Sequence, residues 1–210
     1  MIKIDWRSCD SMAEIPEQEQ MEYWVDWLAS YHDRDLCILE VGSFHGQSTA
    51  LLAQFGKVTT IDLWSNVDDC LADYEGIGIR HWEAFIQNMT RLKLVPERVI
   101  PVVSTSDAVS NMGFFDVIFI DANHNYEAVK KDVLNTHQHL LHGGLLIFDD
   151  YKRPGFGYPP LDGEFQQQMT DPWIGVQRAV DELLELGGYK IVEHFRGKIC
   201  LRKGYVDDEK

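Results

Sequence analysis

The pattern of apolar positions along the chain alternates between two types. Short uninterrupted apolar runs predict strands that are covered on both faces, as in a parallel sheet. The five runs of this type span residues 37–41, 58–62, 99–103, 115–121 and 145–149. Pro101 has no backbone N–H to donate, so we expect the third strand to lie near an edge of the sheet.

Between these runs, apolar residues recur every three or four positions, which predicts amphipathic helices. The helical stretches lie at about residues 21–28, 48–55, 82–92, 126–140 and 176–184. Near the end, Tyr189–Phe195 and Lys198–Arg202 are separated by Arg196 and Gly197 alone, a spacing that demands a β-hairpin. The pattern therefore predicts an α/β fold: an open, mostly parallel sheet of seven strands with helices on both faces and an antiparallel hairpin at one edge.

The length of 210 residues favours a single domain. We expect an N-terminal helical cap over residues 1–34, a core over 35–203 and an acidic tail over 204–210. Two segments, 63–79 and 151–172, match neither pattern, and each follows the carboxyl end of a strand. Ligands bind at that edge of an open α/β sheet, and long loops there tend to be functional lids.

The chain is strongly acidic, with 19 Lys and Arg against 34 Asp and Glu and a formal net charge of −15. Such a charge repels phosphate backbones and anionic lipid, so neither nucleic acid nor a membrane is an expected partner. No stretch resembles a signal peptide or a membrane span. The four cysteines form no Cys-x-x-Cys pair, and Cys37 and Cys200 lie within apolar runs as small hydrophobic residues. We therefore expect a cytoplasmic protein.

A glycine-containing turn joins the first strand to its helix, from Glu40 to Gly46. Gly42 permits a tight turn and the close approach of a ligand, and Gly46 opens the helix, where free N–H groups suit anionic groups. Asp62 ends the next strand, where a carboxylate can accept hydrogen bonds from ribose hydroxyls. The glycines could also form a packed turn alone, but with Asp62 they favour a nucleoside site. The spacing is not that of the dinucleotide fingerprint G-x-G-x-x-G.

The E-x-G-x-x-x-G turn, Asp62 and the terminal hairpin resemble those of class I S-adenosylmethionine-dependent methyltransferases, over about residues 36 to 203. The resemblance implies a Rossmann-like fold with S-adenosyl-L-methionine as cofactor. It implies that Gly42 and Gly46 line the methionine part and that Asp62 holds the ribose. The cofactor-binding residues expected on this basis are Glu40, Gly42, Ser43, Gly46, Ser48, Asp62, Leu63, Trp64, Ser104, Ser106, Asp107 and Asp121.

Two parts of that set have an equally weighted structural explanation. Trp64, expected near the adenine, could be a packed loop aromatic. The segment from Ser104 to Asp107, expected at the adenine edge, could cap the following helix.

A group of acidic residues follows two adjacent predicted strands, with Asp121 after the fourth and Asp149 and Asp150 after the fifth. Three carboxylates at one sheet edge repel one another unless they are protonated or bound to a cation. Oxygen ligands of this kind favour Mg²⁺, Mn²⁺ or Ca²⁺ over zinc. His124 follows Asp121 by three residues and can face the same pocket, where a neutral imidazole suits a general base. Each residue alone could be a cap or solvated, but the joint pattern favours a site.

The sequence FDVIFIDANHNYEAVKKD, followed by GGLLIFDDY, resembles the macrocin-type metal-dependent sugar O-methyltransferases. The resemblance implies that Asp121, Asp149 and Asp150 hold the metal. It implies that His124 is the base for the hydroxyl of a small-molecule acceptor, a sugar or glycoside. Other members can carry Glu in place of Asp149 and have an added N-terminal domain, which leaves substrate choice and assembly into a homo-oligomer open.

Three alternatives stay open. Catechol and caffeoyl-CoA methyltransferases, which act on phenolic substrates, resemble the chain less, because a lysine often stands where His124 does. A nicotinamide-dependent oxidoreductase is disfavoured by the missing glycine and by the hairpin. A non-catalytic cofactor-binding protein is disfavoured because Asp121, His124, Asp149 and Asp150 are all present.

Overall fold

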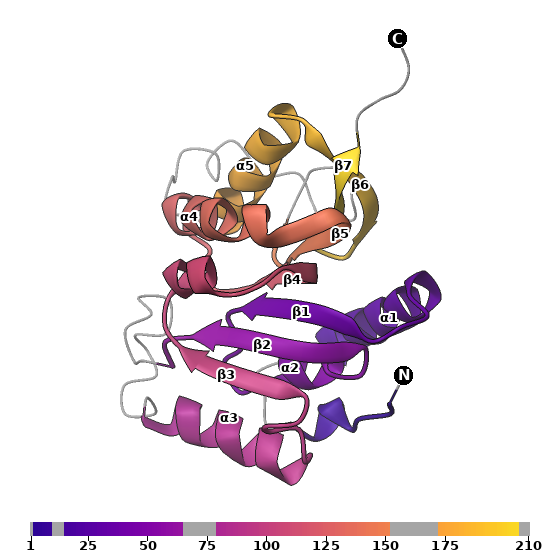
Figure 1. The fold of residues 1–210 in the computed structure, drawn as a ribbon, viewed down its shortest axis with the longest axis vertical. Helices are drawn as coiled ribbons and strands as arrows, with labels where there is room; N and C mark the ends of the chain where they lie inside the picture. The colour runs from indigo at the N-terminus through magenta and orange to yellow at the C-terminus, as the bar shows by residue number, and fades with distance from the viewer. Residues whose placement is uncertain (1, 10–14, 65–78, 152–171, 206–210) are drawn as a thin grey trace. The chain divides into compact units, whose positions relative to one another are not determined.

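A computed structural model describes residues 2–9, 15–64, 79–151 and 172–205 (Figure 1). Both predicted lid segments therefore lie largely outside the described residues. The elements, in chain order, are η1 (Trp6–Ser8), α1 (Ile15–Tyr31), β1 (Leu36–Val41), α2 (Gln47–Leu52), β2 (Gly56–Asp62), α3 (Ile79–Arg91), β3 (Val99–Val103), η3 (Ser106–Asn111), β4 (Phe115–Ile120), α4 (Tyr126–Thr136), η4 (His137–His139), β5 (Leu140–Phe148), α5 (Pro172–Glu185), β6 (Gly188–Phe195) and β7 (Lys198–Tyr205).

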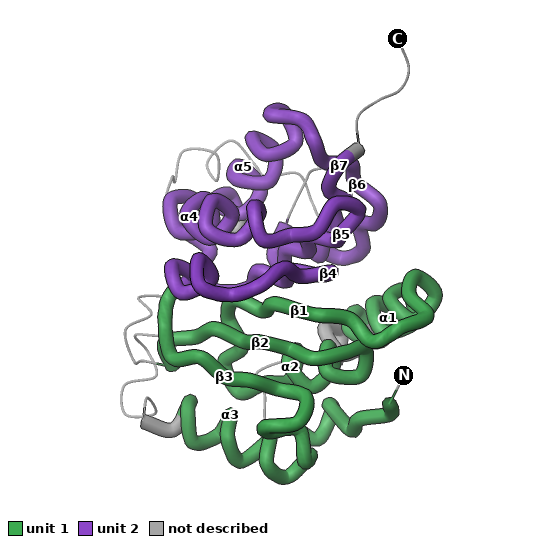
Figure 2. The backbone as a smooth tube through the Cα atoms, in the orientation of Figure 1, with its two compact units in different colours: residues 1–105 green, residues 106–210 purple. Residues whose placement is uncertain are grey.

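The strand order in the sheet is β3-β2-β1-β4-β5-β7-β6. This confirms the predicted fold class, a mostly parallel seven-stranded sheet with a C-terminal antiparallel hairpin, and it places β3 with its Pro101 at an edge. The chain divides into two compact units, residues 1–105 and 106–210 (Figure 2).

In the first unit, β1, β2 and β3 are parallel and in continuous register, with Val41 opposite Ile61 and Asp62 opposite Val103. Most hydrophobic positions of β1 and β2 are buried, whereas in the edge strand β3 only Val99 is. α3 adds a stripe at helical spacing in which Phe85 and Met89 are fully buried. Because β1 and β2 end beside one another, the turn that leaves β1 lies next to Asp62.

In the second unit, β4 and β5 are parallel, and β7 pairs antiparallel with both β5 and β6. Every residue of β4 is buried, as its uninterrupted apolar run predicts. Antiparallel pairing aligns Phe148, the last residue of β5, with Ile199 near the start of β7. The hairpin turn at Arg196 and Gly197 therefore lies at the end of β5 where Asp149 emerges.

Three local predictions are wrong. The fourth helix ends at Thr136 rather than at residue 140, and β5 begins at Leu140 rather than at residue 145. The apolar spacing carries on across this junction, so periodicity could not locate it. Gly144 lies inside β5, and close packing requires a glycine there, because a Cβ at this position would lie 2.9 Å from the Asp116 carbonyl oxygen. Cys37 is exposed, although every residue that follows it in β1 is buried, so the cover over this face of the strand begins only after Cys37.

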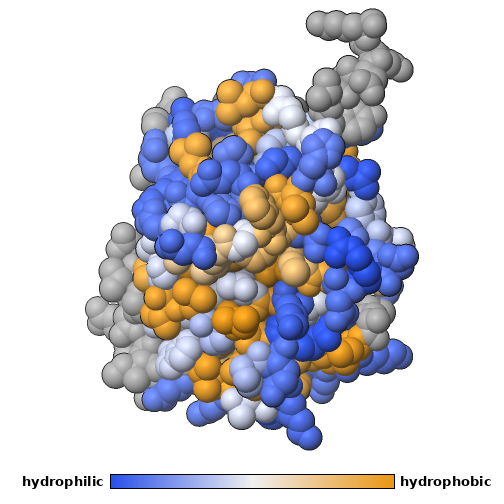
Figure 3. All heavy atoms as spheres, in the orientation of Figure 1, coloured by the Kyte–Doolittle hydropathy of each residue, from blue (hydrophilic) through white to orange (hydrophobic). Residues whose placement is uncertain are grey.

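No helix among the described residues is both long and apolar enough to cross a membrane. Apolar side chains on the surface include Leu63, Ile100 and Val103, each more than half exposed. In the view of Figure 3, hydrophilic and apolar side chains are interspersed.

Candidate functional site

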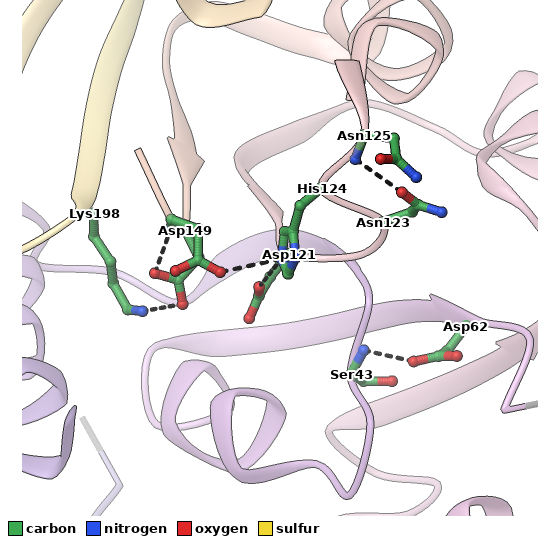
Figure 4. A network of polar contacts seen from close by, with 9 residues as sticks. Ser43, Asp62, Asp121, Asn123, His124, Asn125, Asp149 and Lys198 are labelled. Atoms are coloured by element: carbon green, nitrogen blue, oxygen red, sulfur yellow. Dashed lines mark hydrogen bonds and ion pairs between the residues drawn. The ribbon is translucent and has the colours of Figure 1, made fainter. Parts of the chain in front are cut away.

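The Asp62 carboxylate organises the glycine turn of the first unit. One of its oxygens accepts hydrogen bonds from the backbone N–H of Ser43 at 2.8 Å and of Phe44 at 2.9 Å. The other accepts from the backbone N–H of Trp64 at 2.8 Å. Figure 4 shows the bond from Ser43 to Asp62. An ionised carboxylate has about four acceptor positions, so Asp62 fixes the turn and keeps capacity for one ligand hydroxyl.

The backbone of this turn occupies conformations that most residues avoid. Gly42 and Gly46 have φ of 90° and 87°, and Phe44 between them has φ of 46°. A non-glycine residue in this region is strained, and such strain persists where the surroundings hold it, often at ligand sites. Here the surroundings include Trp64, whose indole N–H donates to the Phe44 carbonyl at 2.9 Å.

Trp64 has the position of a packed aromatic. Its side chain is 7% exposed and contacts the rings of Trp82 and Phe85, both 4.8 Å away between centroids. This matches the structural alternative, while a contact of Trp64 or of the exposed Leu63 with adenine stays a prediction.

Two polar side chains near the turn are buried. Glu40 is fully buried and accepts a hydrogen bond from the Thr49 hydroxyl at 2.5 Å. Ser43 is 5% exposed, and its hydroxyl has no hydrogen-bond partner among the described residues. A buried hydroxyl without a partner is costly, so a polar ligand at the turn would satisfy it. Ser48, on the first turn of α2, is half-buried.

The segment expected at the adenine edge is divided between the units. The Ser104 backbone N–H donates to the Asp62 carbonyl at 3.1 Å. Ser106 and Asp107 begin η3, where α4 holds both side chains: Asn135 donates to both, and Lys131 pairs with the Asp107 carboxylate at 2.7 Å. Adenine binding by these residues stays a prediction.

The second unit brings three of the predicted site residues together. His124 Nε2 lies 3.1 Å from an Asp150 oxygen and 3.5 Å from an Asp121 oxygen. One ligand atom from each of the three residues falls within 4.8 Å of the others. All three side chains are about one quarter exposed, so a ligand can reach them. Figure 4 shows His124 beside Asp121. We call Asp121, His124 and Asp150 the acidic triad.

Asp149 lies beside the triad but is committed elsewhere. Its Oδ2 forms an ion pair with the Lys198 ammonium, and its Oδ1 accepts from the Asp150 backbone N–H at 2.8 Å. The Lys198 and Asp149 side chains are 12% and 18% exposed. Lys198 was not among the residues expected at the site. The signal was its place directly after the hairpin turn, which puts it beside the end of β5.

Neighbouring carboxylates control the ionisation of this group. Burial and the charge of Asp149 raise the pKa of Asp121, and burial with the same kind of repulsion raises the pKa of Asp150 to about 7. Burial works to lower the pKa of His124, but the hydrogen bond and charge of Asp121 and the charge of Asp150 exceed it and raise that pKa to about 9. For Lys198, burial also opposes the charge, yet Asp149 and Asp121 raise its pKa.

The chain around the triad is fixed from several sides. Asp150 has φ of 58°, and Tyr151 after it is buried, with its hydroxyl donating to Asp181 at 2.8 Å and its backbone N–H to the Gly197 carbonyl at 2.7 Å. On α5, Gly175 packs directly against the backbone at His124. The contact leaves no room for a side chain, since a Cβ at Gly175 would lie 2.2 Å from the His124 carbonyl oxygen. These contacts hold His124 and Asp150 in place.

The donor set fits a divalent cation. Three carboxylates and one ammonium leave two negative charges when His124 is neutral, and carboxylate oxygens suit Mg²⁺ or Mn²⁺. Asp121 and Asp150 each place an oxygen in the acidic triad, whereas the two oxygens of Asp149 contact Lys198 and the Asp150 backbone N–H. The structure therefore groups two of the three expected metal ligands with the expected base.

Replacing Gly46 by alanine should destabilise the protein. A Cβ at Gly46 would lie 2.7 Å from Met89 Cε and 2.9 Å from Phe85 Cδ2, and φ is unfavourable for alanine. Urea unfolding should show a loss of about 2 kcal/mol or more. The matched control is Gly113→Ala, where a Cβ meets nothing within 4 Å. Its stability should stay within about 0.5 kcal/mol of the parent. Equal stability of the two variants would contradict this account.

The pKa of His124 should lie near 9 in the metal-free protein. Because this exceeds the value of about 6.5 for an unfolded chain, His124 stabilises the fold fully below pH 6.5, and the effect is lost as the pH rises through 9. NMR titration, with assignment by His124→Gln, measures the value. Asp150→Asn removes a charge 3.1 Å away and should lower it. A pKa at or below 6.5 in the parent protein would refute the assigned electrostatics.

Comparison with solved structures supports the fold. A putative caffeoyl-CoA O-methyltransferase from Staphylococcus aureus superposes with a TM-score of 0.63 at 18% identity, over 95% of this chain and 87% of that one. An O-methyltransferase from Bacillus cereus, in complex with SAH, gives 0.61 at 18% identity, over 93% and 83%. At these identities the likeness concerns the fold alone.

Sequence comparison identifies the family. The uncharacterized protein R132 of Acanthamoeba polyphaga mimivirus is 26% identical over 130 residues, which cover 59% of this chain and 55% of that protein's length. A model of the methyltransferase domain family matches residues 39–151, more than half of the chain, from the glycine turn through Asp149 and Asp150. The predicted S-adenosylmethionine-dependent methyltransferase class is thereby confirmed, and the chain belongs to the methyltransferase domain family.

Proposed function

We propose that this protein transfers the methyl group of S-adenosyl-L-methionine to a hydroxyl of a small molecule. The observation that carries the proposal is the acidic triad, in which two carboxylates and an imidazole converge at the ends of β4 and β5. A hydroxyl oxygen is a poor nucleophile at neutral pH, and this group has the residues that could activate one. The acceptor would be a sugar or glycoside, as the sequence resemblance implies.

The glycine turn supports the donor part of the proposal. Asp62 holds the turn open in a strained shape and keeps one acceptor position for a ribose hydroxyl. The buried Ser43 hydroxyl provides a second polar group that a bound nucleoside could satisfy. Both features are expected of a site that is preorganised for a ligand.

The acidic triad would hold a divalent cation through Asp121 and Asp150. Mg²⁺ or Mn²⁺ is the proposed ion, and Ca²⁺ is an alternative because it also takes oxygen ligands. The bound cation would supply Lewis-acid polarisation of an acceptor oxygen. His124 would then accept the hydroxyl proton at Nε2, the atom that faces both carboxylates.

Proton acceptance by His124 depends on the charge state of its neighbours. With both carboxylates uncompensated, the pKa of His124 is about 9, so the imidazole carries a proton at neutral pH and cannot act as a base. Neutralising Asp121 and Asp150 removes what raises this pKa and so frees His124 to accept a proton. Methyl transfer further requires the oxygen, carbon and sulfur in line, so positioning supplies much of the acceleration.

A phenolic acceptor is the alternative substrate class, since the matched Staphylococcus aureus structure is described as a putative caffeoyl-CoA O-methyltransferase. The acidity of the acceptor discriminates the two. A phenol needs less help to lose its proton than a sugar hydroxyl, so dependence on His124 should be weaker for a phenol.

The central test is methyl transfer by His124→Gln. With S-adenosylmethionine, Mg²⁺ and a panel of glycosides and catechols, turnover of the best acceptor should fall about 100-fold or more, because a positioned base contributes about 10²–10⁴. Binding of S-adenosylmethionine, measured by calorimetry, should stay within about twofold. His139→Gln is the matched control, since His139 instead contacts the Gly113 carbonyl at 3.0 Å.

Two results would contradict the proposal. Undiminished turnover in His124→Gln would remove His124 from the reaction. Failure of the parent protein to bind S-adenosylmethionine would remove the donor site at the glycine turn, whatever the acceptor.

A further inference from the structure

We propose that Lys198 is a built-in counter-cation that withholds Asp149 from metal binding, so that the protein holds its divalent cation through Asp121 and Asp150 without the third carboxylate. The inference deepens the proposed function and rests on it. It departs from the ligand set that the sequence resemblance implies, in which Asp121, Asp149 and Asp150 act together.

The first argument is the commitment of Asp149. Both of its oxygens have partners within the protein: the Lys198 ammonium and the Asp150 backbone N–H. By contrast, Asp121 and Asp150 each have an oxygen directed at His124, in the group whose ligand atoms lie within 4.8 Å of one another. Asp149 is not a member of that group.

The second argument is the placement of Lys198 by the fold. Pairing of Phe148 with Ile199 fixes the first residue of β7 beside the residue that follows β5. The Tyr151 backbone N–H bonds to the Gly197 carbonyl at 2.7 Å and ties the hairpin turn to the same segment. The Lys198 ammonium lies 5.9 Å from the centre of the Phe119 ring, and the side chain is 12% exposed. Because the Lys198 side chain is largely shielded from solvent, water could not readily replace Asp149 as the partner of its ammonium.

The third argument is charge. Leaving a largely buried ammonium without its carboxylate strongly destabilises the folded protein. If a metal ion bound Asp149, its binding free energy would therefore have to offset the cost of an unpaired Lys198. With the pair intact, the remaining charge is that of two carboxylates, which one divalent cation balances. Lys198 and Asp149 thus neutralise each other, so we expect that replacing both residues by neutral ones leaves the charge available to the divalent cation unchanged.

The test is a double-mutant cycle on the full chain, with Mn²⁺ alone as the probe, measured by calorimetry and by the loss of the free Mn²⁺ EPR signal. Lys198→Met adds net negative charge and frees Asp149, so the Mn²⁺ Kd should fall about tenfold or more. Asp149→Asn leaves Lys198 unpaired, so the Kd should rise. The double variant should bind Mn²⁺ within about threefold of the parent protein, while Asp121→Asn should weaken binding at least about tenfold.

The outcomes separate the possible roles. A double variant that binds more than tenfold more weakly than the parent would show Asp149 to be a ligand and overturn the inference. A Lys198→Met variant with lowered thermal stability and an unchanged Mn²⁺ Kd would reduce Lys198 to a structural role and overturn it as well. Absence of Mn²⁺ binding by the parent protein would also refute it.

Binding of S-adenosylmethionine by the same variants keeps this test apart from the proposed function. The glycine turn contains neither Lys198 nor Asp149, so the donor Kd should stay within about twofold throughout the cycle. If the parent protein binds no donor, the proposed function fails. If donor binding is intact but the Mn²⁺ cycle gives an overturning result, the assignment of Lys198 fails alone.

Discussion

Repulsion among three partly buried carboxylates is the constraint on which the chemistry of this molecule depends. Asp121, Asp149 and Asp150 follow the ends of adjacent strands, and burial raises the pKa of Asp121 and of Asp150. Two basic side chains of the protein offset this repulsion. His124 lies between Asp121 and Asp150, and Lys198 forms an ion pair with Asp149. Lys198 thus balances the charge of Asp149, and under the proposed function a divalent cation would balance the charges of Asp121 and Asp150.

In the glycine turn of the first unit, backbone N–H groups instead of cationic side chains stabilise a carboxylate. Here a single carboxylate, Asp62, is stabilised by three backbone N–H groups, and in return it fixes the strained residues Phe44 and Trp64. Packing reinforces this, since Met89 and Phe85 on α3 leave room for glycine alone at position 46. Both units therefore use carboxylates at strand ends to hold backbone in conformations that a ligand can exploit.

Much of the fold and part of the site could be predicted from the sequence. Buried parallel strands appear as apolar runs, and the two-residue spacing at Arg196 and Gly197 allowed little other than a hairpin. The same logic placed Asp121 and Asp150 at one edge with His124 nearby. The boundary at Leu140 was missed because helix and strand share an apolar residue there, so periodicity carries no signal.

Lys198 was missed for a different reason. Its role depends on which strand β7 pairs with and in what register, and these are long-range properties that local patterns do not encode. When the pairing of β5 with β7 is not known, nothing in the sequence distinguishes Asp149 from the expected metal ligands Asp121 and Asp150. With that pairing, the charges of Asp149 and Lys198 cancel, which is the basis for proposing a cation held by Asp121 and Asp150 alone.

Diffraction from crystals grown with Mn²⁺ and S-adenosylhomocysteine, recorded with the anomalous signal of manganese, tests the account most directly. The account predicts one manganese peak bonded to oxygens of Asp121 and Asp150, with Lys198 still paired to Asp149. Manganese bonded to Asp149 with Lys198 displaced, or no peak at the acidic triad, would contradict it.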